Sequence, residues 1–243
     1  MRNALFWAQY IRRVYLPEIG LLREGAFDRL LPCLADERIG RDAEAAGQQT
    51  WERLSAIAGP DSDPDELAEH AQDAELVRFQ MLTGLRQALM NLFAVALHHL
   101  LEQQQLFLLR RELLPPREEH QHALLKSREF ITRSGEAGVE VTALSGWDDL
   151  EELRHVANAV KHAEGQAVEL LRTLRPDIFL HPLLRGAHPD ELRTGRRRVY
   201  KPLFGEDLYV VEPDLERYFE AARRFWQSYA QSLERLEQRG SIP

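Results

Sequence analysis

The stretch ALMNLFAVALHHLLEQQ, residues 88–104, decides the fold of this chain. Apolar residues occupy nearly every side of the helix that it predicts, and a helix of that kind lies at the centre of a bundle. The helical pattern begins at Pro64, after the capping residue Asp63, and runs to Leu114, where two prolines end it. We therefore expect an all-α fold, a helical bundle around a long central helix.

Further helices flank the central one. Amphipathic patterns, capping residues and glycine or proline breaks predict them at residues 3–15, 25–58 with a break near Gly40, 116–133, 148–162, 167–174 and 214–238. Three prolines and two glycines predict an irregular loop at 175–195. Short apolar runs on either side of Gly205 predict a small β-hairpin insertion near residues 196–211. Because the composition does not shift along the chain, we expect residues 1–243 to form a single helical domain, with the loop and hairpin at about 175–212.

The composition excludes several classes of protein. The chain has 243 residues, of which 44% are hydrophobic, and a formal net charge of −8, which is typical of a soluble globular protein. Its longest apolar stretch, residues 88–97, is too short and too polar to span a bilayer. The N-terminus lacks the pattern of a secretory signal. Cys33 is the only cysteine, so an intrachain disulfide and a cysteine-built zinc site are excluded. We expect a cytoplasmic protein with no membrane contact.

Metal ligands are sparse in the sequence. Glu119 and His122 have the Glu-x-x-His spacing of di-metal bundles, which need two such motifs and two further carboxylates. We therefore expect neither a metal nor a cofactor.

Five polar side chains of the central helix fall in one narrow stripe, since each residue advances by about 100°. They are Gln87, Asn91, His98, Glu102 and Gln105. Leaving a buried polar group unpaired costs about 1–3 kcal/mol, so a buried stripe must find partners. The stripe is thus a core network that fixes the helix register, the wall of a polar pocket, or a face turned to solvent.

A second polar face lies on the helix predicted at 148–162. It carries Glu151, Arg154, Asn158, Lys161 and His162, opposite an apolar side. An ordinary solvated face is the simple interpretation. However, Asn and His are mediocre helix formers, and Lys161 is one of three lysines beside 28 arginines. We expect this face to meet Gln87, Asn91, His98 and Glu102 across one polar pocket, because the central helix cannot leave its stripe unpaired.

The segment ELRHVANAVKHAEG, residues 152–165, together with the central helix resembles all-helical bacterial proteins of the HEPN superfamily over roughly residues 75–165. The resemblance implies a homodimer that binds RNA or cleaves it without a metal, as part of a bacterial stress or defence system. Toxin–antitoxin and abortive-infection systems are of this kind. An antitoxin or another defence protein is then an expected partner.

The motif of that superfamily is an arginine, four to six residues, and a histidine. Seven residues separate Arg154 from His162, while the pairs Arg117–His122 and Arg175–His181 have the strict spacing. With 28 arginines and nine histidines, chance alone gives about three such pairs.

The best match to the catalytic residues is therefore His162 with Arg154 or Lys161. His162 would transfer protons and the two cations would hold the phosphate, while Asn158 would orient the imidazole. The partner's copy of this histidine would fill the second proton-transfer role.

A basic segment, TGRRRVYKPLF at residues 194–204, interleaves cations with aromatic side chains. Its candidate RNA-binding residues are Arg196, Arg197, Arg198, Tyr200 and Lys201. Basic charge beside aromatics suits a phosphate backbone with stacked bases. The alternative is a solvated hairpin that packs its aromatics inward.

Two functions follow from these patterns. The first is a HEPN-like RNA-binding protein or metal-independent endoribonuclease, and it predicts that Arg154, Asn158 and His162 converge in a groove with basic surface. The alternative is a non-catalytic helical scaffold or protein-interaction partner, in which these side chains are dispersed in solvent or locked into ion pairs.

Overall fold

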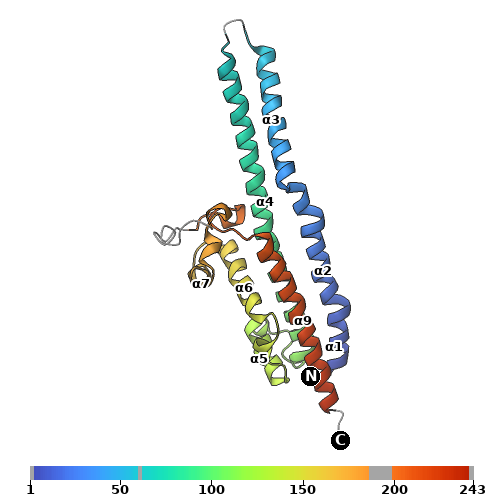
Figure 1. The fold of residues 1–243 in the computed structure, drawn as a ribbon. Coiled ribbons are helices and arrows are strands. Elements are labelled where there is room, and N and C mark those ends of the chain that lie inside the picture. The colour runs from blue at the N-terminus through green and yellow to red at the C-terminus, as the bar shows by residue number, and fades with distance from the viewer. Residues whose placement is uncertain (1–2, 60–61, 186–198, 241–243) are drawn as a thin grey trace.

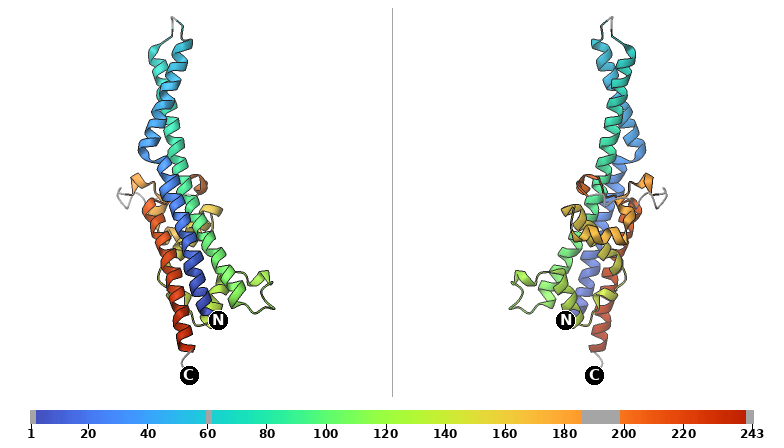
Figure 2. Two further views of the ribbon diagram at one scale, coloured as in Figure 1. Left: turned by 90° about the vertical axis from the view of Figure 1, so that its right-hand side faces the viewer. Right: turned by 90° about the vertical axis from the view of Figure 1, so that its left-hand side faces the viewer.

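The computed structural model describes residues 3–59, 62–185 and 199–240. Within these ranges all regular secondary structure is helical, which confirms the expected all-α fold. The molecule is elongated, because a long hairpin of two helices projects from a body in which the remaining helices pack (Figure 1). Both chain ends lie at the end of the body away from the hairpin. The outer part of the hairpin stands clear of the body in both views of Figure 2.

The N-terminal arm is nearly continuous helix. It comprises α1 (Ala4–Tyr10), a π-helical turn (Ile11–Tyr15), α2 (Leu16–Glu24), a second π-helical turn (Gly25–Leu30) and a 3-10 turn (Leu31–Leu34). The end predicted before Pro17 is wrong. A proline ring collides with the carbonyl group one α-helical turn earlier, and the wider π-helical turn directly before Pro17 relieves that clash.

The projecting hairpin consists of α3 (Asp36–Ile57) and α4 (Pro64–Leu108), and a π-helical turn (Leu109–Leu113) extends α4. This confirms the long central helix and its cap, since the Asp63 side chain accepts a hydrogen bond from the Asp65 N–H at 2.9 Å. The break predicted near Gly40 is wrong. The chain turns earlier, at the extended residue Ala35, and α3 runs through Gly40 without interruption.

Small residues bring the two hairpin helices close together. The buried residues of α3 are Ile39, Ala43 and Gly47. A Cβ atom at Gly47 would lie 3.1 Å from the Ala71 carbonyl oxygen, so a larger side chain there would push the helices apart. Beyond Gly47 no residue of α3 is buried, and α4, described over its whole length, has none before Leu82.

The body is formed by the N-terminal arm, the second half of α4 and four more helices. These are α5 (Ser127–Glu136), α6 (Trp147–His162), α7 (Gln166–Leu174) and α9 (Glu212–Gly240). The last three agree with the predicted ranges to within two residues. Of the helix predicted at 116–133, only the part from Ser127 forms, and turns with a 3-10 segment (His122–Leu124) precede it. The aromatic core lies on α9, where Phe219, Phe225, Trp226 and Tyr229 are fully buried.

The predicted β-hairpin is wrong for the part of it that the structure describes. Residues 199–211 contain no strand, only a 3-10 turn (Pro202–Phe204) followed by an extended run. Gly205 has φ +79°, and a Cβ atom there would come within 2.7 Å of the Gln87 Cβ, so this turn packs directly on α4. A hairpin partner strand is unnecessary, because side chains of α4 bind the backbone of the run.

In residues 3–59, 62–185 and 199–240 no helix is long and apolar enough to cross a membrane. Nor do three or more His, Cys, Asp or Glu side chains of those ranges gather in a way that could hold a metal ion.

Candidate functional site

The polar stripe of α4 divides into two halves with different partners. In the first half, the Asn91 amide donates to the carbonyl oxygens of Pro202, at 2.6 Å, and Leu208, at 2.9 Å. Its oxygen accepts from the Val210 N–H at 3.2 Å, and the Gln87 amide donates to the Val210 carbonyl at 2.8 Å. Both side chains are buried. Gln87 and Asn91 therefore hold the run before α9 against the central helix, where a strand would otherwise be needed.

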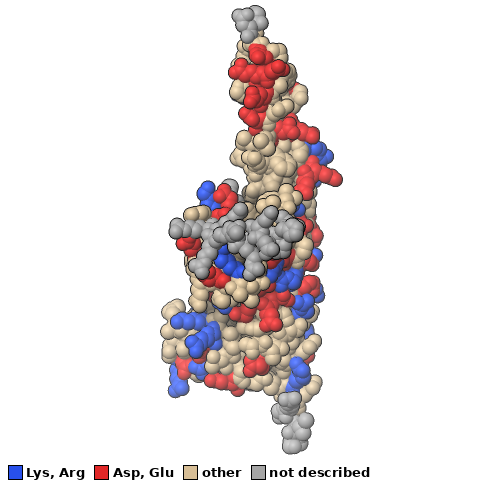
Figure 3. Space-filling model, turned by 60° about the vertical axis from the view of Figure 1, so that its left-hand side comes forward, with Lys and Arg blue, Asp and Glu red and all other residues tan. Residues whose placement is uncertain are grey.

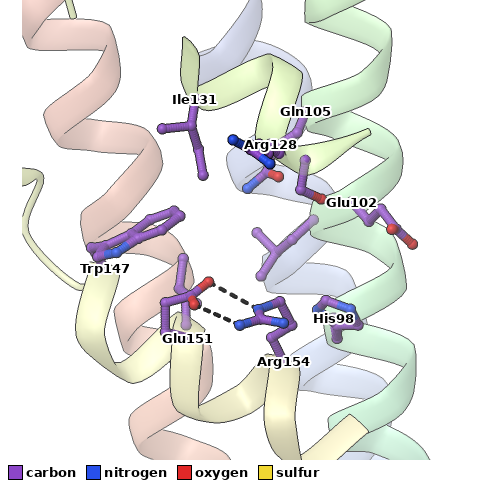
Figure 4. Close-up of a pocket in the computed structure, with 11 residues that line it drawn as sticks. His98, Glu102, Gln105, Arg128, Ile131, Trp147, Glu151 and Arg154 are labelled. Carbon is purple, nitrogen blue, oxygen red and sulfur yellow. Dashed lines mark hydrogen bonds and ion pairs between the residues drawn. The ribbon is translucent and has the colours of Figure 1, made fainter. Parts of the chain in front are cut away.

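The second half of the stripe lines a pocket of about 270 Å³ between α4, α5 and α6. Its walls are His98, Leu101, Glu102 and Gln105 from α4, Ser127, Arg128 and Ile131 from α5, and Trp147, Leu150, Glu151 and Arg154 from α6. From the two predicted polar faces, the pocket is lined by His98, Glu102 and Gln105 of α4 and by Glu151 and Arg154 of α6. The other residues that were expected to face each other, Gln87, Asn91, Asn158 and His162, do not line it. The Trp147 ring and the His98 imidazole lie on opposite sides of it (Figure 4).

The charges in this pocket are largely balanced against one another. Arg154 forms a two-pronged ion pair with Glu151, with its Nε and Nη2 at 3.1 and 2.8 Å from the two carboxylate oxygens (Figure 4). Across the pocket, Glu102 lies 3.3 Å from the Nδ1 of His99. A phosphate entering the pocket would have to compete with Glu151 for Arg154. Arg128 is the other cation of the wall, and its side chain is exposed.

His98 is a neutral base in this pocket at pH 7. Burial lowers the pKa of its imidazole to about 4 despite the nearby Glu102 carboxylate, and the charges of Arg154 and Lys161 act in the same direction as burial. A neutral imidazole accepts one hydrogen bond and donates one, so His98 can bind a polar ligand. It cannot supply a proton to a leaving group near neutral pH.

Of the predicted catalytic residues, Arg154 alone lines the pocket. Asn158 is half-buried on α6, and Lys161 and His162 are exposed at the end of that helix. One histidine that the sequence reasoning missed is His155, whose Nε2 lies 3.4 Å from the Arg154 guanidinium. Burial and the Arg154 charge lower its pKa.

The first part of the basic segment, residues 194–198 with Arg196, Arg197 and Arg198, lies outside the described residues. Tyr200 is 67% exposed. Lys201 is exposed, and its Nζ is 3.7 Å from a Glu206 carboxylate oxygen.

The two strictly spaced arginine–histidine pairs also lie apart from the pocket. Arg117 and His122 are exposed near turns. Arg175 belongs to an ion-pair network with Glu152, Asp177 and Asp214. This network joins α6 to α9, because one Glu152 oxygen also accepts from Arg217 at 2.5 Å and from Tyr218 at 2.6 Å. No spacing in the sequence indicates it, since its bonded members are up to 66 residues apart.

An uncovered apolar surface lies on the projecting hairpin, on the segment Leu76–Leu85 of α4, which we call the apolar band. Its exposed side chains are Leu76 (54%), Val77 (53%), Phe79 (45%), Met81 (62%) and Leu85 (43%). Arg78 is the only charged residue in this segment. The sequence reasoning missed the band, because the same residues would suit a helix with neighbours on every side.

Carboxylates cover the hairpin beyond the apolar band. From Asp63 to Glu75 the chain has six acidic residues and no lysine or arginine; we call this the acidic segment. On the face drawn in Figure 3, acidic side chains gather over the outer part of the hairpin, and most of the basic ones lie lower, over the body.

Comparison with known proteins adds no relative. No family model matches the chain. No curated protein and no solved structure matches it either.

Proposed function

We propose that this protein is a non-catalytic interaction protein, a helical scaffold whose binding surface is the projecting α3–α4 hairpin. The observation that carries the proposal is the apolar band. Five large apolar side chains within ten residues are each at least 43% exposed. Clustered exposure of this kind marks interaction sites, because water contact with apolar surface is unfavourable and a partner removes it.

The arrangement of the hairpin supports the same function. Beyond Gly47 and before Leu82, neither helix buries a residue, so the outer hairpin contributes little to the core of its own molecule. A segment that does not stabilise the fold of its own molecule is available to bind another surface. The body, by contrast, holds the hairpin firmly at its base through the buried half of α4.

The pocket supports this function over catalysis. An arginine that was expected to hold phosphate is bound by Glu151, the pocket histidine His98 is neutral, and His162 lies in solvent. Ion-paired and dispersed side chains are what the scaffold interpretation predicts.

Our second proposal is a HEPN-like RNA-binding protein or metal-independent endoribonuclease, acting as a homodimer with an antitoxin or other defence protein. One observation favours it, namely that Arg128, Arg154 and the stacking surface of Trp147 line the same pocket. Two guanidinium groups beside an indole suit a nucleotide.

Site-specific photo-crosslinking in the host cell tests the first proposal. A photoreactive residue in place of Phe79 should give a discrete protein adduct, and one in place of Leu174, which is 58% exposed on α7, should not. Adducts of equal yield at both positions, or none at Phe79, would contradict it.

Incubation of the purified chain with cellular RNA in chelator tests the second proposal. Cleavage that His162→Ala abolishes, with the fold intact, would favour the ribonuclease. RNA left uncut from mildly acidic to neutral pH would argue against it.

A further inference from the structure

We infer that the partner of the hairpin is a basic amphipathic helix of another protein, which lies along α4 with its apolar side on the apolar band and its basic residues against the acidic segment. This inference rests on the proposed interaction function and names the chemistry of the partner. It starts from the order of residues on α4, where an acidic segment and an apolar band follow each other without interruption.

The shape of the surface suits a helix. Leu76 and Phe79 are three residues apart and share one side of α4 with Asp65 and Glu69, whereas Val77 and Met81 lie on another side, about 150° around the helix. A second helix packs on one such side, so the partner contacts Leu76 and Phe79 within the apolar band. The acidic segment and the apolar band together extend for about 30 Å, the length of a helix of about 20 residues. A helix bound there would complete a three-helix bundle with α3 and α4.

The charge decides between classes of partner. Asp63, Glu69 and Asp73 are exposed carboxylates with no lysine or arginine between them along α4. They repel nucleic acid and anionic lipid and attract a basic segment. Electrostatic complementarity of this kind sets which partner is accepted and how fast it binds.

A second copy of the chain fits this surface poorly. Two copies in parallel would place the acidic segment against the same carboxylates. In an antiparallel pair with the apolar bands in register, the acidic segment would meet residues 86–98. That part of α4 is packed into the body, where Asn91, Ala94 and Leu97 are fully buried.

The test is peptide binding by fluorescence anisotropy, using the full chain. The probe is a labelled leucine–lysine peptide of about 20 residues, designed as an amphipathic helix. One control peptide replaces each lysine with glutamate, and another has the same composition in an order that removes the amphipathic pattern. The basic amphipathic peptide should bind at least about ten-fold more tightly than either control.

Variants of the chain separate the two parts of the surface. Phe79→Ser should weaken binding by about ten-fold, as loss of a central apolar contact does. Leu174→Ser makes the same kind of change on the body and should leave binding unchanged. The double variant Glu69→Gln, Asp73→Asn should weaken binding at low salt and reduce its dependence on salt, since surface charges are screened.

Three results would overturn the inference. They are equal binding of the acidic or the scrambled peptide, binding unaffected by Phe79→Ser, and a dimer in light scattering that Phe79→Ser dissociates. A photo-crosslinked adduct at Phe79 combined with any of these would leave the interaction function standing and remove only the basic helix.

Discussion

The helix α4 belongs to two regions of the molecule that treat its side chains in opposite ways. In the projecting hairpin it exposes Leu76, Val77 and Phe79, and in the body it buries Gln87 and Asn91. The apolar residues of one half are in water while the amides of the other half are in the core. Burial along this helix therefore follows what surrounds each turn, and not the polarity of the residue.

The partners available in each region explain the difference. In the body, α4 packs against α6, α9 and the run before α9, and the backbone of that run needs the hydrogen bonds that Gln87 and Asn91 make. In the hairpin, α4 meets α3 alone, through small residues. A helix pair of this kind covers one side of each helix and leaves the rest to solvent or to another molecule.

The largest expected effect is a difference in the free energy of unfolding between substitutions at two tryptophans. Trp226 is fully buried in the body, and Trp51 of α3 is 37% exposed in the hairpin. Trp226→Ala should lower the free energy of unfolding by about 3–5 kcal/mol, because it opens a cavity in the aromatic core. Trp51→Ala should lower it by less than about 1 kcal/mol. Urea denaturation of both variants measures the contrast, and equal losses would show that the hairpin is as integral to stability as the body.

A second effect tests the buried amides. Asn91→Leu keeps the branched shape of the side chain but leaves the Leu208 carbonyl and the Val210 N–H without their partner. It should lower the free energy of unfolding by about 2–4 kcal/mol. The matched variant Gln72→Leu, on an exposed turn of the hairpin, should change it by no more than about 0.5 kcal/mol. If Asn91→Leu were as stable as the wild type in the same denaturation assay, the structural role of Asn91 would be refuted.

The third expected effect is a loss of folding stability at low pH. The folded chain holds the pKa of His98 at about 4, whereas an unfolded histidine has a pKa near 6.5. The unfolded state therefore binds more protons between these values, and stability should fall as the pH drops below about 6.5. From pH 7 to pH 5 the expected loss from this group is about 1–2 kcal/mol. His98→Gln should reduce that loss in urea titrations at the two pH values, and an unchanged pH dependence would disprove the burial effect.

The smallest expected effect on stability lies in the apolar band. Phe79→Ser should change the free energy of unfolding by no more than about 0.5 kcal/mol, because the ring has few neighbours to lose. The same change should weaken the peptide binding described above by about ten-fold. A thermal melt beside the binding assay separates the two results, and a large drop in the melting temperature would place Phe79 in the core.

Several elements could be predicted from sequence because their signals are local. Asp63 and Pro64 start α4, two prolines end the helical pattern after Leu114, and Gly165 separates α6 from α7. In each case the deciding residues lie within one or two turns of the boundary. Pro17 was misjudged because a π-helical turn before it absorbs the clash, and nothing in the sequence indicates that turn.

The candidate site was predicted in part. His98, Glu102 and Arg154 could be paired because helical periodicity places them on polar faces that two neighbouring helices turn toward each other. The partners of the ion pair, Arg154 and Glu151, also lie within one helical turn of each other. The geometry of the pair depends on the side chains that line the pocket around it. His162 lies outside the pocket because of where α6 ends relative to α4. Helical periodicity within one segment carries no information about that relative position.

The sequence by itself determined most of the helical segments, since helix formation depends on residues within about one turn of each other. Only the tertiary structure decided which faces of those helices are covered. It placed the Asn91 amide against the Leu208 carbonyl, 117 residues away, and so removed the need for the predicted β-hairpin. It also left the apolar band without a neighbour. Burial is a property of contacts between distant segments, and one helix can carry both outcomes.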